Sequence, residues 1–482
     1  MDKEYKDLCQ VFTPDQNVIE LLDWGNYKQN LYDKKIIENS CGNGQILKEV
    51  VKRYIEDSIK NNKKNKEIKS GLENHIYGIE YDPEKYNECI HNLDKIVKEY
   101  GLKNINWKNI KQKDTLTNIE KNKFDYVVGN PPYIKYKSLS IEDREYIKNK
   151  FSTCKNGKFD YCYAFIEASM MMLNDKGTMA YLIPSSIFKN VFAQNLRNFI
   201  KPHILKIYDY TTAKLFNKET NDIKKNRLTS SIIMILKKNS NQNYIEYIDV
   251  MKNTNIKIEK NNLKDKWIFK EKVMCEEKKR RFGDYFSAAN TIATLYNNAY
   301  IIKEYTEDEK YIYPLIGGKI EKKVLKDTIS PKTFNRDKIE KIIFPYYYWK
   351  NELKRYSEEE FERKFPNTCK YLKEFEKWLQ GRKSDKNAEW FEYGRSQALK
   401  NSNQEKILLS TVITNKVNTK ILSADNIPYS GIYITRKCKK DLKYADKILN
   451  SKDFYEYLCS KGINASGNSI RITARDINEY MF

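Results

Sequence analysis

Short apolar runs recur along the first half of the chain, and stretches with the spacing of helices separate several of them. A strand that is buried on both faces reads as a continuous apolar run, as in parallel sheets. Strands that alternate with helices are typical of α/β domains. We therefore predict a Rossmann-like, mostly parallel α/β sheet with strands at Ile36–Ile37, Ile76–Ile79, Tyr126–Val128, Met179–Ile183, Ile204–Tyr208 and Ile232–Leu236.

The tetrapeptide Asn130-Pro131-Pro132-Tyr133 directly follows one of these runs, residues 124–129. Each proline removes a backbone N–H donor and stiffens the loop, which leaves carbonyl oxygens beside the side-chain oxygen of Asn130. Two acceptors and the aromatic face of Tyr133 suit a planar amine such as adenine N6. Taken alone, the same residues are also compatible with a Pro-rich turn that merely ends a strand.

A second group of polar and glycine residues lies upstream, in residues 35–47, which have the pattern of a strand, a turn and a helix. Glycine lets the backbone approach a ligand closely. Neither G-x-G-x-x-G nor G-x-x-x-x-G-K-[ST] is present, which disfavours a dinucleotide and a triphosphate. The next strand ends in Glu80, where doubly wound folds place a carboxylate that binds ribose hydroxyls. Asp114 follows a further short β-like stretch, a natural place for contact with an adenine ring, although each acid alone is compatible with a solvated loop.

In their order along the chain, these motifs resemble the amino-methyltransferases of the γ arrangement, and more closely the TaqI-like adenine-N6 DNA methyltransferases. The motifs are specific across roughly residues 8–240. The resemblance implies S-adenosylmethionine (AdoMet) as the cofactor, with the catalytic domain first and a target-recognition domain last. By the resemblance, Thr13 contacts the methionine end of AdoMet, Glu80 its ribose, and Asp114 and Phe165 its adenine. The full set of implied cofactor-binding residues is Thr13, Glu38, Cys41, Gly42, Gly44, Glu80, Asp114 and Phe165.

The resemblance also implies that Asn130, Pro131, Pro132 and Tyr133 are the catalytic residues. Adenine N6 is a poor nucleophile because its lone pair is delocalised into the ring. Hydrogen bonds to the Asn130 side chain and the Pro131 carbonyl would localise that lone pair. The base must leave the duplex to be reached, and Tyr133 would stack on it. A second aromatic residue completes the target-base pocket in the family, and the matching position here is Leu236, which departs from that pattern.

The charge of the chain favours a polyanionic partner. Residues 1–250 contain 41 Lys and Arg against 33 Asp and Glu, and residues 251–482 contain 47 against 32, for a net charge of +23. The larger excess in the second half is expected of a region that contacts phosphates, although an AT-rich genome would also raise the lysine content. We predict an AdoMet-binding catalytic domain in residues 1–245 and a mixed α+β target-recognition domain for double-stranded DNA in residues 246–482. The aromatic block 390–395 is expected to be domain core. The basic residues considered for DNA contact are Arg280, Arg281, Arg382, Lys383, Arg395, Arg471 and Arg475.

Other features of the composition disfavour several classes of protein. The nine cysteines are scattered without a C-x-x-C pair and only three histidines occur, so no metal site is expected. The Pro-Cys dipeptide of cytosine-C5 methyltransferases is missing. No apolar run reaches membrane-spanning length, and no signal peptide is recognisable. A cytoplasmic protein with reduced thiols is therefore expected.

Three alternative functions remain open from the sequence. Glutamine N-methyltransferases use the same tetrapeptide, although a protein substrate does not require such a long basic region. RNA methylation is compatible with the charge, whereas a non-enzymatic DNA-binding module would not need the cofactor residues. We expect a monomer that acts either as part of a restriction-modification system or as a solitary enzyme. No segment is placed or sized as a nuclease domain, so any cognate restriction endonuclease would be encoded separately.

Overall fold

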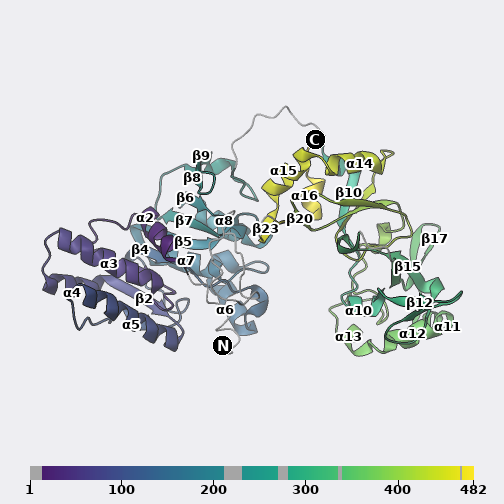
Figure 1. The fold of residues 1–482 in the computed structure, drawn as a ribbon, viewed down its shortest axis with the longest axis horizontal. Helices are drawn as coiled ribbons and strands as arrows, with labels where there is room; N and C mark the ends of the chain where they lie inside the picture. Colours follow the sequence, from purple (N-terminus) through teal and green to yellow (C-terminus); the bar gives the residue numbers. More distant parts are fainter. Residues whose placement is uncertain (1–12, 211–230, 270–279, 335–338, 467–468) are drawn as a thin grey trace. The chain divides into compact units, whose positions relative to one another are not determined.

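The computed structural model describes residues 13–210, 231–269, 280–334, 339–466 and 469–482 (Figure 1). The chain forms two compact units. Unit 1 comprises Met1–Val273 together with Ile463–Gly467, and unit 2 comprises Met274–Gly462 together with Asn468–Phe482. Within the described residues, no helix combines the length and the apolar character needed to cross a membrane.

A nine-stranded sheet forms the centre of unit 1, in the order β3-β2-β1-β4-β5-β7-β6-β8-β9. The strands from β3 to β5 are parallel, whereas β7 is antiparallel to both of its neighbours. This sheet confirms the predicted Rossmann-like α/β class, and all six predicted apolar runs lie in it. Its strands are β1 (Ile36–Glu38), β2 (Ile76–Glu80), β3 (Ile110–Gln112), β4 (Phe124–Gly129), β5 (Leu173–Pro184), β6 (Ile204–Asp209), β7 (Ser231–Lys237), β8 (Tyr244–Asp249) and β9 (Thr254–Glu259). Unit 1 also includes β23 (Ile463–Ser466).

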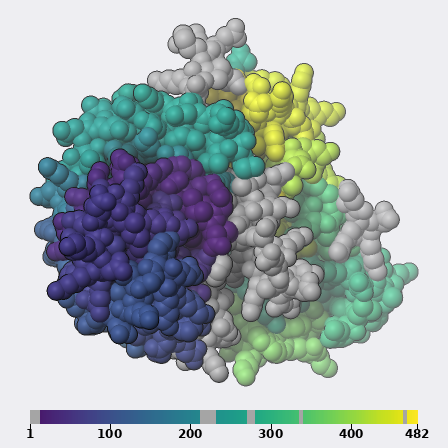
Figure 2. All heavy atoms as spheres, turned by 60° about the vertical axis from the view of Figure 1, so that its left-hand side comes forward, coloured from purple at the N-terminus to yellow at the C-terminus, as the bar shows by residue number. Residues whose placement is uncertain are grey.

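Each face of this sheet carries its own hydrophobic core, because successive side chains of a strand point to opposite faces. Ile36 and Val128 pack with helices α2 to α5, while their neighbours Ile37 and Val127 pack with α6 to α8. Figure 1 shows helices on both sides of the sheet, and in Figure 2 the purple and blue helices α3 to α5 lie at the front of unit 1. The helices are α2 (Asp15–Trp24), α3 (Gln45–Lys60), α4 (Asn65–His75), α5 (Pro83–Glu99), α6 (Ile141–Lys150), α7 (Cys162–Met172) and α8 (Gln194–Ile200).

The sheet of unit 1 continues beyond residue 245, where the predicted catalytic domain ends. Residue 245 lies inside β8, and the compact unit extends to Val273. The edge strand β9 buries none of its side chains fully, and the surrounding sequence is rich in Asn and Lys. Such a strand has no continuous apolar run, so the sequence carried little signal for it. The boundary between the compact units therefore follows β9, while the division of function between the two domains stays a prediction.

Unit 2 combines small antiparallel sheets with short helices, as predicted for a mixed α+β domain. The sheets have the orders β10-β22-β19-β21, β11-β16-β15, β12-β13-β14 and β17-β18, and β20 pairs with β24. The strands are β10 (Phe286–Asn290), β11 (Ile301–Ile302), β12 (Tyr305–Glu307), β13 (Tyr311–Pro314), β14 (Ile320–Glu321), β15 (Leu325–Thr328), β16 (Glu340–Ile343), β17 (Tyr346–Trp349), β18 (Glu352–Arg355), β19 (Lys406–Leu409), β20 (Val412–Thr414), β21 (Thr419–Leu422), β22 (Ile432–Arg436) and β24 (Ser469–Arg471). The helices are α9 (Phe282–Tyr285), α10 (Asn297–Tyr300), α11 (Glu358–Lys364), α12 (Pro366–Lys373), α13 (Glu376–Gln380), α14 (Leu442–Leu449), α15 (Lys452–Lys461) and α16 (Ala474–Asn478).

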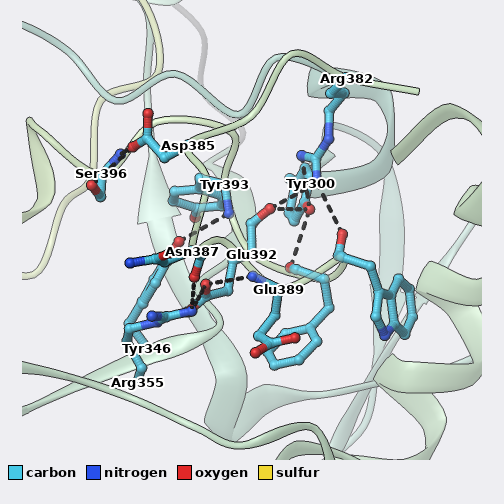
Figure 3. Close-up of polar contacts among 12 residues, drawn as sticks. Tyr300, Tyr346, Arg355, Arg382, Asp385, Asn387, Glu389, Glu392, Tyr393 and Ser396 are labelled. Carbon is cyan, nitrogen blue, oxygen red and sulfur yellow. Dashed lines mark hydrogen bonds and ion pairs between the residues drawn. The ribbon is translucent and has the colours of Figure 1, made fainter. Parts of the chain in front are cut away.

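Arg382 lies at the centre of a polar cluster in unit 2 (Figure 3). Its guanidinium donates hydrogen bonds to the backbone carbonyls of Thr294 (2.6 Å), Trp390 (2.9 Å) and Glu392 (2.9 Å), and to the hydroxyl of Tyr300 (3.2 Å). The three carbonyls belong to residues outside helices and strands, so no helix or sheet hydrogen bonds join these segments. Arg382 therefore joins these segments of unit 2, and its contact with DNA stays a prediction.

The carboxylate of Glu392 forms the second part of the cluster. Arg355 donates two hydrogen bonds to it, at 2.7 and 2.6 Å, and the backbone N–H of Glu389 donates a third at 2.9 Å. The neighbouring Phe391 and Tyr393 are almost completely buried. The aromatic block 390–395 is thus domain core, as predicted, and its one buried acid is fully paired with donors.

Replacement of Arg382 by Met is expected to destabilise unit 2 by about 3 kcal/mol, because several backbone carbonyls lose their donor. Hydrogen exchange measured by mass spectrometry should show faster exchange in peptides of unit 2 and unchanged exchange in unit 1. Arg395→Met is the matched control, since Arg395 is 42% exposed and pairs with the partly exposed Asp385. Equal exchange in the two variants would contradict the structural role of Arg382.

Candidate active site

The carboxyl ends of β2, β1 and β4 lie side by side at one edge of the sheet. The parallel register places Glu38, the last residue of β1, beside Gly78 of β2 and Val128 of β4. Glu80 ends β2, and Asn130 directly follows β4. The strand order reverses between β1 and β4, and open α/β sheets bind ligands at such a switch point. The predicted residues of the first half therefore converge on this edge.

The side chain of Asn130 is held in a defined orientation. Its Nδ2 donates a hydrogen bond to Oγ1 of Thr13 at 3.1 Å, and its Oδ1 accepts one from the Tyr133 hydroxyl at 2.5 Å. The backbone carbonyl of Asn130 accepts a long bond from Ser40 at 3.5 Å. Thr13 is buried just before α2, so the motif near the start of the chain and the tetrapeptide form one site.

The Tyr133 hydroxyl lies within reach of two acceptors. Besides Asn130 Oδ1, the backbone carbonyl of Leu182 in β5 lies 2.8 Å from it. A phenol has a single proton to donate. Burial raises the pKa of Tyr133 well above its usual value, with smaller contributions from Cys162 and Asp160, so the hydroxyl stays protonated at neutral pH. The Tyr133 hydroxyl can thus donate its proton either to Asn130 Oδ1 or to the Leu182 carbonyl.

The Glu80 carboxylate joins the loops that follow β1 and β2. Its Oε2 accepts a hydrogen bond from the N–H of Gly42 at 2.8 Å, and its Oε1 accepts one from the N–H of Asp82 at 2.8 Å. Asp82 in turn caps the first turn of α5 through the N–H of Glu84 at 2.8 Å. Glu80 is therefore fixed at the carboxyl edge, next to the glycine loop.

The two glycines of this loop have different surroundings. Gly42 and Gly44 have φ values of +52° and +81°, which disfavour other residues. A Cβ added to Gly42 would meet no atom within 4 Å, whereas one added to Gly44 would lie 2.7 Å from the sulfur of Cys89. The Cys41 side chain is buried in the core around α3 and α5. Gly42 therefore borders open space, while Gly44 and the side chain of Cys41 serve packing.

The remaining predicted cofactor residues lie at or near the same edge. Glu38 is 3% exposed and accepts a hydrogen bond from the N–H of Leu47 at 3.2 Å. Burial raises the pKa of Glu38 well above its usual value. Asp114 stabilises the turn after β3 by accepting from the N–H of Leu116 at 2.7 Å. Phe165 of α7 is 5% exposed, so only a small part of its ring is open to a ligand.

A buried polar network beneath the site was not anticipated from the sequence. Asn39 donates to Ser169 Oγ at 2.9 Å and accepts from the Tyr181 hydroxyl, and the backbone carbonyl of Asn39 accepts from Thr115. Ser169 and Tyr181 are themselves 2.6 Å apart. The network links Asn39, which directly follows β1, with α7 and β5. A polar residue in the middle of an apolar helix, as Ser169 is in α7, was the available signal.

Asp160 is a further acid beside the tetrapeptide. It forms a backbone bridge with Lys135, and its carboxylate accepts from the N–H of Cys162 at 3.3 Å. Burial raises the pKa of Asp160 to about 6.

Leu236 does not lie at this edge, which corrects its assignment to the target-base pocket. It is 0% exposed and pairs with Met179, which lies in the middle of β5. Because β7 runs antiparallel to β5, its first residue, Ser231, lies beside Pro184 at the carboxyl edge, and Leu236 lies towards the opposite end. The segment before Ser231, residues 211–230, is outside the described residues.

The other arginines considered for DNA contact in unit 2 mostly have partners within the protein. Arg395 pairs with Asp385 at 2.8 Å and Arg475 with Glu479 at 2.6 Å. Arg281 donates to the backbone carbonyl of Asn478 at 3.2 Å. In the parts of the chain that the structure describes, no group of three or more His, Cys, Asp or Glu side chains is placed to hold a metal ion.

Comparisons with known proteins agree with the motifs. Over 394 residues the chain is 24% identical to the type II restriction enzyme and methyltransferase RM.Eco57I of Escherichia coli, covering 72% of this chain and 38% of the relative. Over 201 residues it is 31% identical to the type II methyltransferase M.BstVI of Geobacillus stearothermophilus, covering 39% of this chain and 36% of the relative. The chain thus spans less than half the length of these curated relatives.

A similarity of fold extends over both units. A solved structure of the type IIL restriction-modification enzyme MmeI in complex with DNA matches 96% of this chain and 64% of its own chain, with a TM-score of 0.63 and 12% sequence identity. At this identity the likeness concerns the fold alone. Residues 28–216, which include Glu38, Glu80, Asn130 and Tyr133, match the family described as Eco57I restriction-modification methylase. The match confirms the resemblance drawn from the motifs.

Proposed function

We propose that the chain is an AdoMet-dependent DNA methyltransferase that methylates adenine at N6 after the base has left the duplex. The observation that carries this proposal is the oriented Asn130 side chain at the carboxyl end of β4, beside the loop of Gly42 and Glu80. The family match of residues 28–216 and the basic second half of the chain support it.

The loops at the ends of β1 and β2 fit a nucleoside cofactor such as AdoMet. The space beside Gly42 is open, and the Glu80 carboxylate borders the same loop. A carboxylate offers about four lone-pair sites, so Glu80 can accept from ribose hydroxyls while it keeps its backbone donors. Asp114 and Phe165 would contact the adenine, and Thr13 the methionine end. When bound, AdoMet supplies a methyl group on a positively charged sulfur.

Asn130 would prepare the target amine for reaction. Hydrogen bonds from the amine to the Asn130 side-chain oxygen and to the Pro131 carbonyl draw the nitrogen towards tetrahedral geometry. Its lone pair is then localised and would form the new N–C bond while the S–CH3 bond breaks and leaves its electron pair on the sulfur. The methylated nitrogen would then release one proton to water. Positioning and electrostatics supply the rate enhancement, so no strong base is required before transfer.

The Tyr133 hydroxyl would occupy the place of the amine until the base arrives. It donates to Asn130 Oδ1 at 2.5 Å, and the Leu182 carbonyl is a second acceptor at 2.8 Å. When the amine binds Asn130, the hydroxyl proton can turn to Leu182, so that no buried donor is left unpaired. The ring of Tyr133 would then stack on the flipped base.

The restriction-modification context extends the proposal. We propose that the chain acts as a monomer on double-stranded DNA, either as part of a restriction-modification system or as a solitary enzyme. Methylation of RNA or of a protein glutamine by the same Asn130 chemistry is the competing function, and the first test separates the two.

The first test is single-molecule sequencing of DNA from a host that lacks adenine methylation and expresses this chain. We expect one sequence motif modified at adenine N6. Asn130→Ala should abolish the modification, because the amine loses its acceptor, while the dissociation constant for AdoMet stays within about threefold. Unmodified DNA despite soluble wild-type protein would move the function to RNA or protein. A loss of AdoMet binding in Asn130→Ala would show that the tetrapeptide is structural.

A pair of substitutions separates the two roles of Tyr133. Tyr133→Phe keeps the ring, so we expect kcat/KM within about threefold of wild type, a difference below about 1 kcal/mol. Tyr133→Ala removes the stacking surface, and we expect a loss of about tenfold or more. Steady-state methylation of a duplex that contains the motif measures both. If the Phe variant were as inactive as the Ala variant, the hydroxyl itself would be required and the exchange of acceptors would be wrong.

The carboxylate of Glu80 should be needed to bind the cofactor. Glu80→Ala is expected to weaken AdoMet binding by about 10- to 100-fold, in line with the loss of charge-assisted hydrogen bonds. Isothermal titration calorimetry measures this directly. Glu84→Ala is the control, because Glu84 is an exposed acid in the first turn of α5. Similar affinities for the two variants would exclude Glu80 from the cofactor site.

A further inference from the structure

Unit 2 contains a cavity of about 830 Å³ that lies away from the cluster around Arg382. Two segments supply most of its wall, residues 331–334 and residues 410–420. The second segment includes β20, the start of β21 and the loop between them. Three of the lining residues are lysines, and the others include serine, threonine and asparagine.

The lining of this cavity carries positive charge without acids. Lys332, Lys416 and Lys420 line it, and none of the twelve lining residues is Asp or Glu. All three lysines are exposed. Among the described residues, Lys332 and Lys416 form no ion pair, and Lys420 donates to the backbone carbonyl of Phe334 at 2.9 Å.

One carboxylate contacts the wall of the cavity from outside the lining. Asp446 of α14 accepts from Thr419 Oγ1 at 2.6 Å and from Asn450 Nδ2 at 3.2 Å. Its Oδ1 is thus engaged by two residues of the wall. These bonds fix Thr419 and Asn450 and leave the three lysines as the charged groups that line the cavity.

The loop that carries Lys416 has a defined conformation. Asn415 has a φ of +62°, and the N–H of Lys416 donates to the carbonyl of Thr414 at 2.7 Å. Asparagine tolerates this left-handed conformation better than most residues. β20 is paired with β24, so the loop extends from a strand that is itself anchored. Lys416 and the exposed Asn418 are therefore presented from a supported turn.

We propose that this cavity is a groove that binds the phosphate backbone of double-stranded DNA, with Lys332, Lys416 and Lys420 as phosphate contacts. The inference rests on the proposed function and locates DNA contact on one surface of unit 2. Lysines spread over two segments suit a run of phosphates better than a single small anion. The hydroxyl and amide groups between them add hydrogen bonds to phosphate and sugar oxygens.

The test compares two double variants that lose the same charge. Lys332→Gln/Lys416→Gln alters the groove, and Lys370→Gln/Lys377→Gln alters exposed lysines of α12 and α13. Binding of a fluorescent 30-base-pair duplex, a length of about three helical turns, is followed by anisotropy over a range of salt concentrations. The groove variant should lower the slope of log K against log salt by about 2 and weaken binding by about tenfold or more. The control should keep the wild-type slope.

The outcomes separate this inference from the proposed function. If wild type methylates DNA and both double variants share its salt slope, the assignment of DNA binding to the groove is wrong and the proposed function stands. If wild type does not bind the duplex at low salt, both fail. A groove variant that loses affinity for duplex RNA but not for duplex DNA also overturns the inference. Thermal melting of each variant controls for the fold, which substitution at exposed lysines should leave intact.

Discussion

The candidate site depends on the parallel register of β2, β1 and β4. These strands are buried on both faces, so a slip by one residue would turn every side chain to the wrong core. With the register fixed, the strand ends align, and Glu80, Glu38 and Asn130 meet at one edge. The chain then needs only short loops to complete the site. The open space at Gly42 and the anchored Glu80 both follow from this edge, as does the polar network of Asn39 beneath it.

The strands of unit 1 that are buried on both faces could be predicted from the sequence. The direction of a strand and the presence of an exposed edge strand could not. Six apolar runs correctly indicated the central strands. The assignment of Leu236 to the target-base pocket failed because an apolar run does not reveal whether its strand runs parallel or antiparallel. Strand β7 is antiparallel to β5. Strand β9 was not predicted because an edge strand with exposed side chains has no continuous apolar run. Among site residues, Asn130 and Glu80 could be found because each directly follows or ends a buried strand.

The basic character of unit 2 was visible from composition, but the roles of individual cations depend on acceptors that are distant in sequence. Arg382 lies next to a lysine in a polar segment and has the appearance of a DNA contact, yet it binds carbonyls of residues 294, 390 and 392. Arg355 is neutralised by Glu392 from 37 residues away. A guanidinium with five donors is well suited to such internal use. The lysines of the groove, whose lining includes no Asp or Glu, are better candidates for phosphate contact than these arginines.

The hydroxyl of Tyr133 shows how a site can be stable both empty and filled. A partly buried amide oxygen such as Asn130 Oδ1 is stabilised by a hydrogen-bond donor beside it. The Tyr133 hydroxyl supplies that donor, and the Leu182 carbonyl offers the same proton a second acceptor at nearly the same distance. In the proposed reaction the hydroxyl would turn to the Leu182 carbonyl when the amine binds, so the Tyr133 proton would keep a partner. Because Thr13 holds the other end of the amide, Asn130 keeps its orientation throughout.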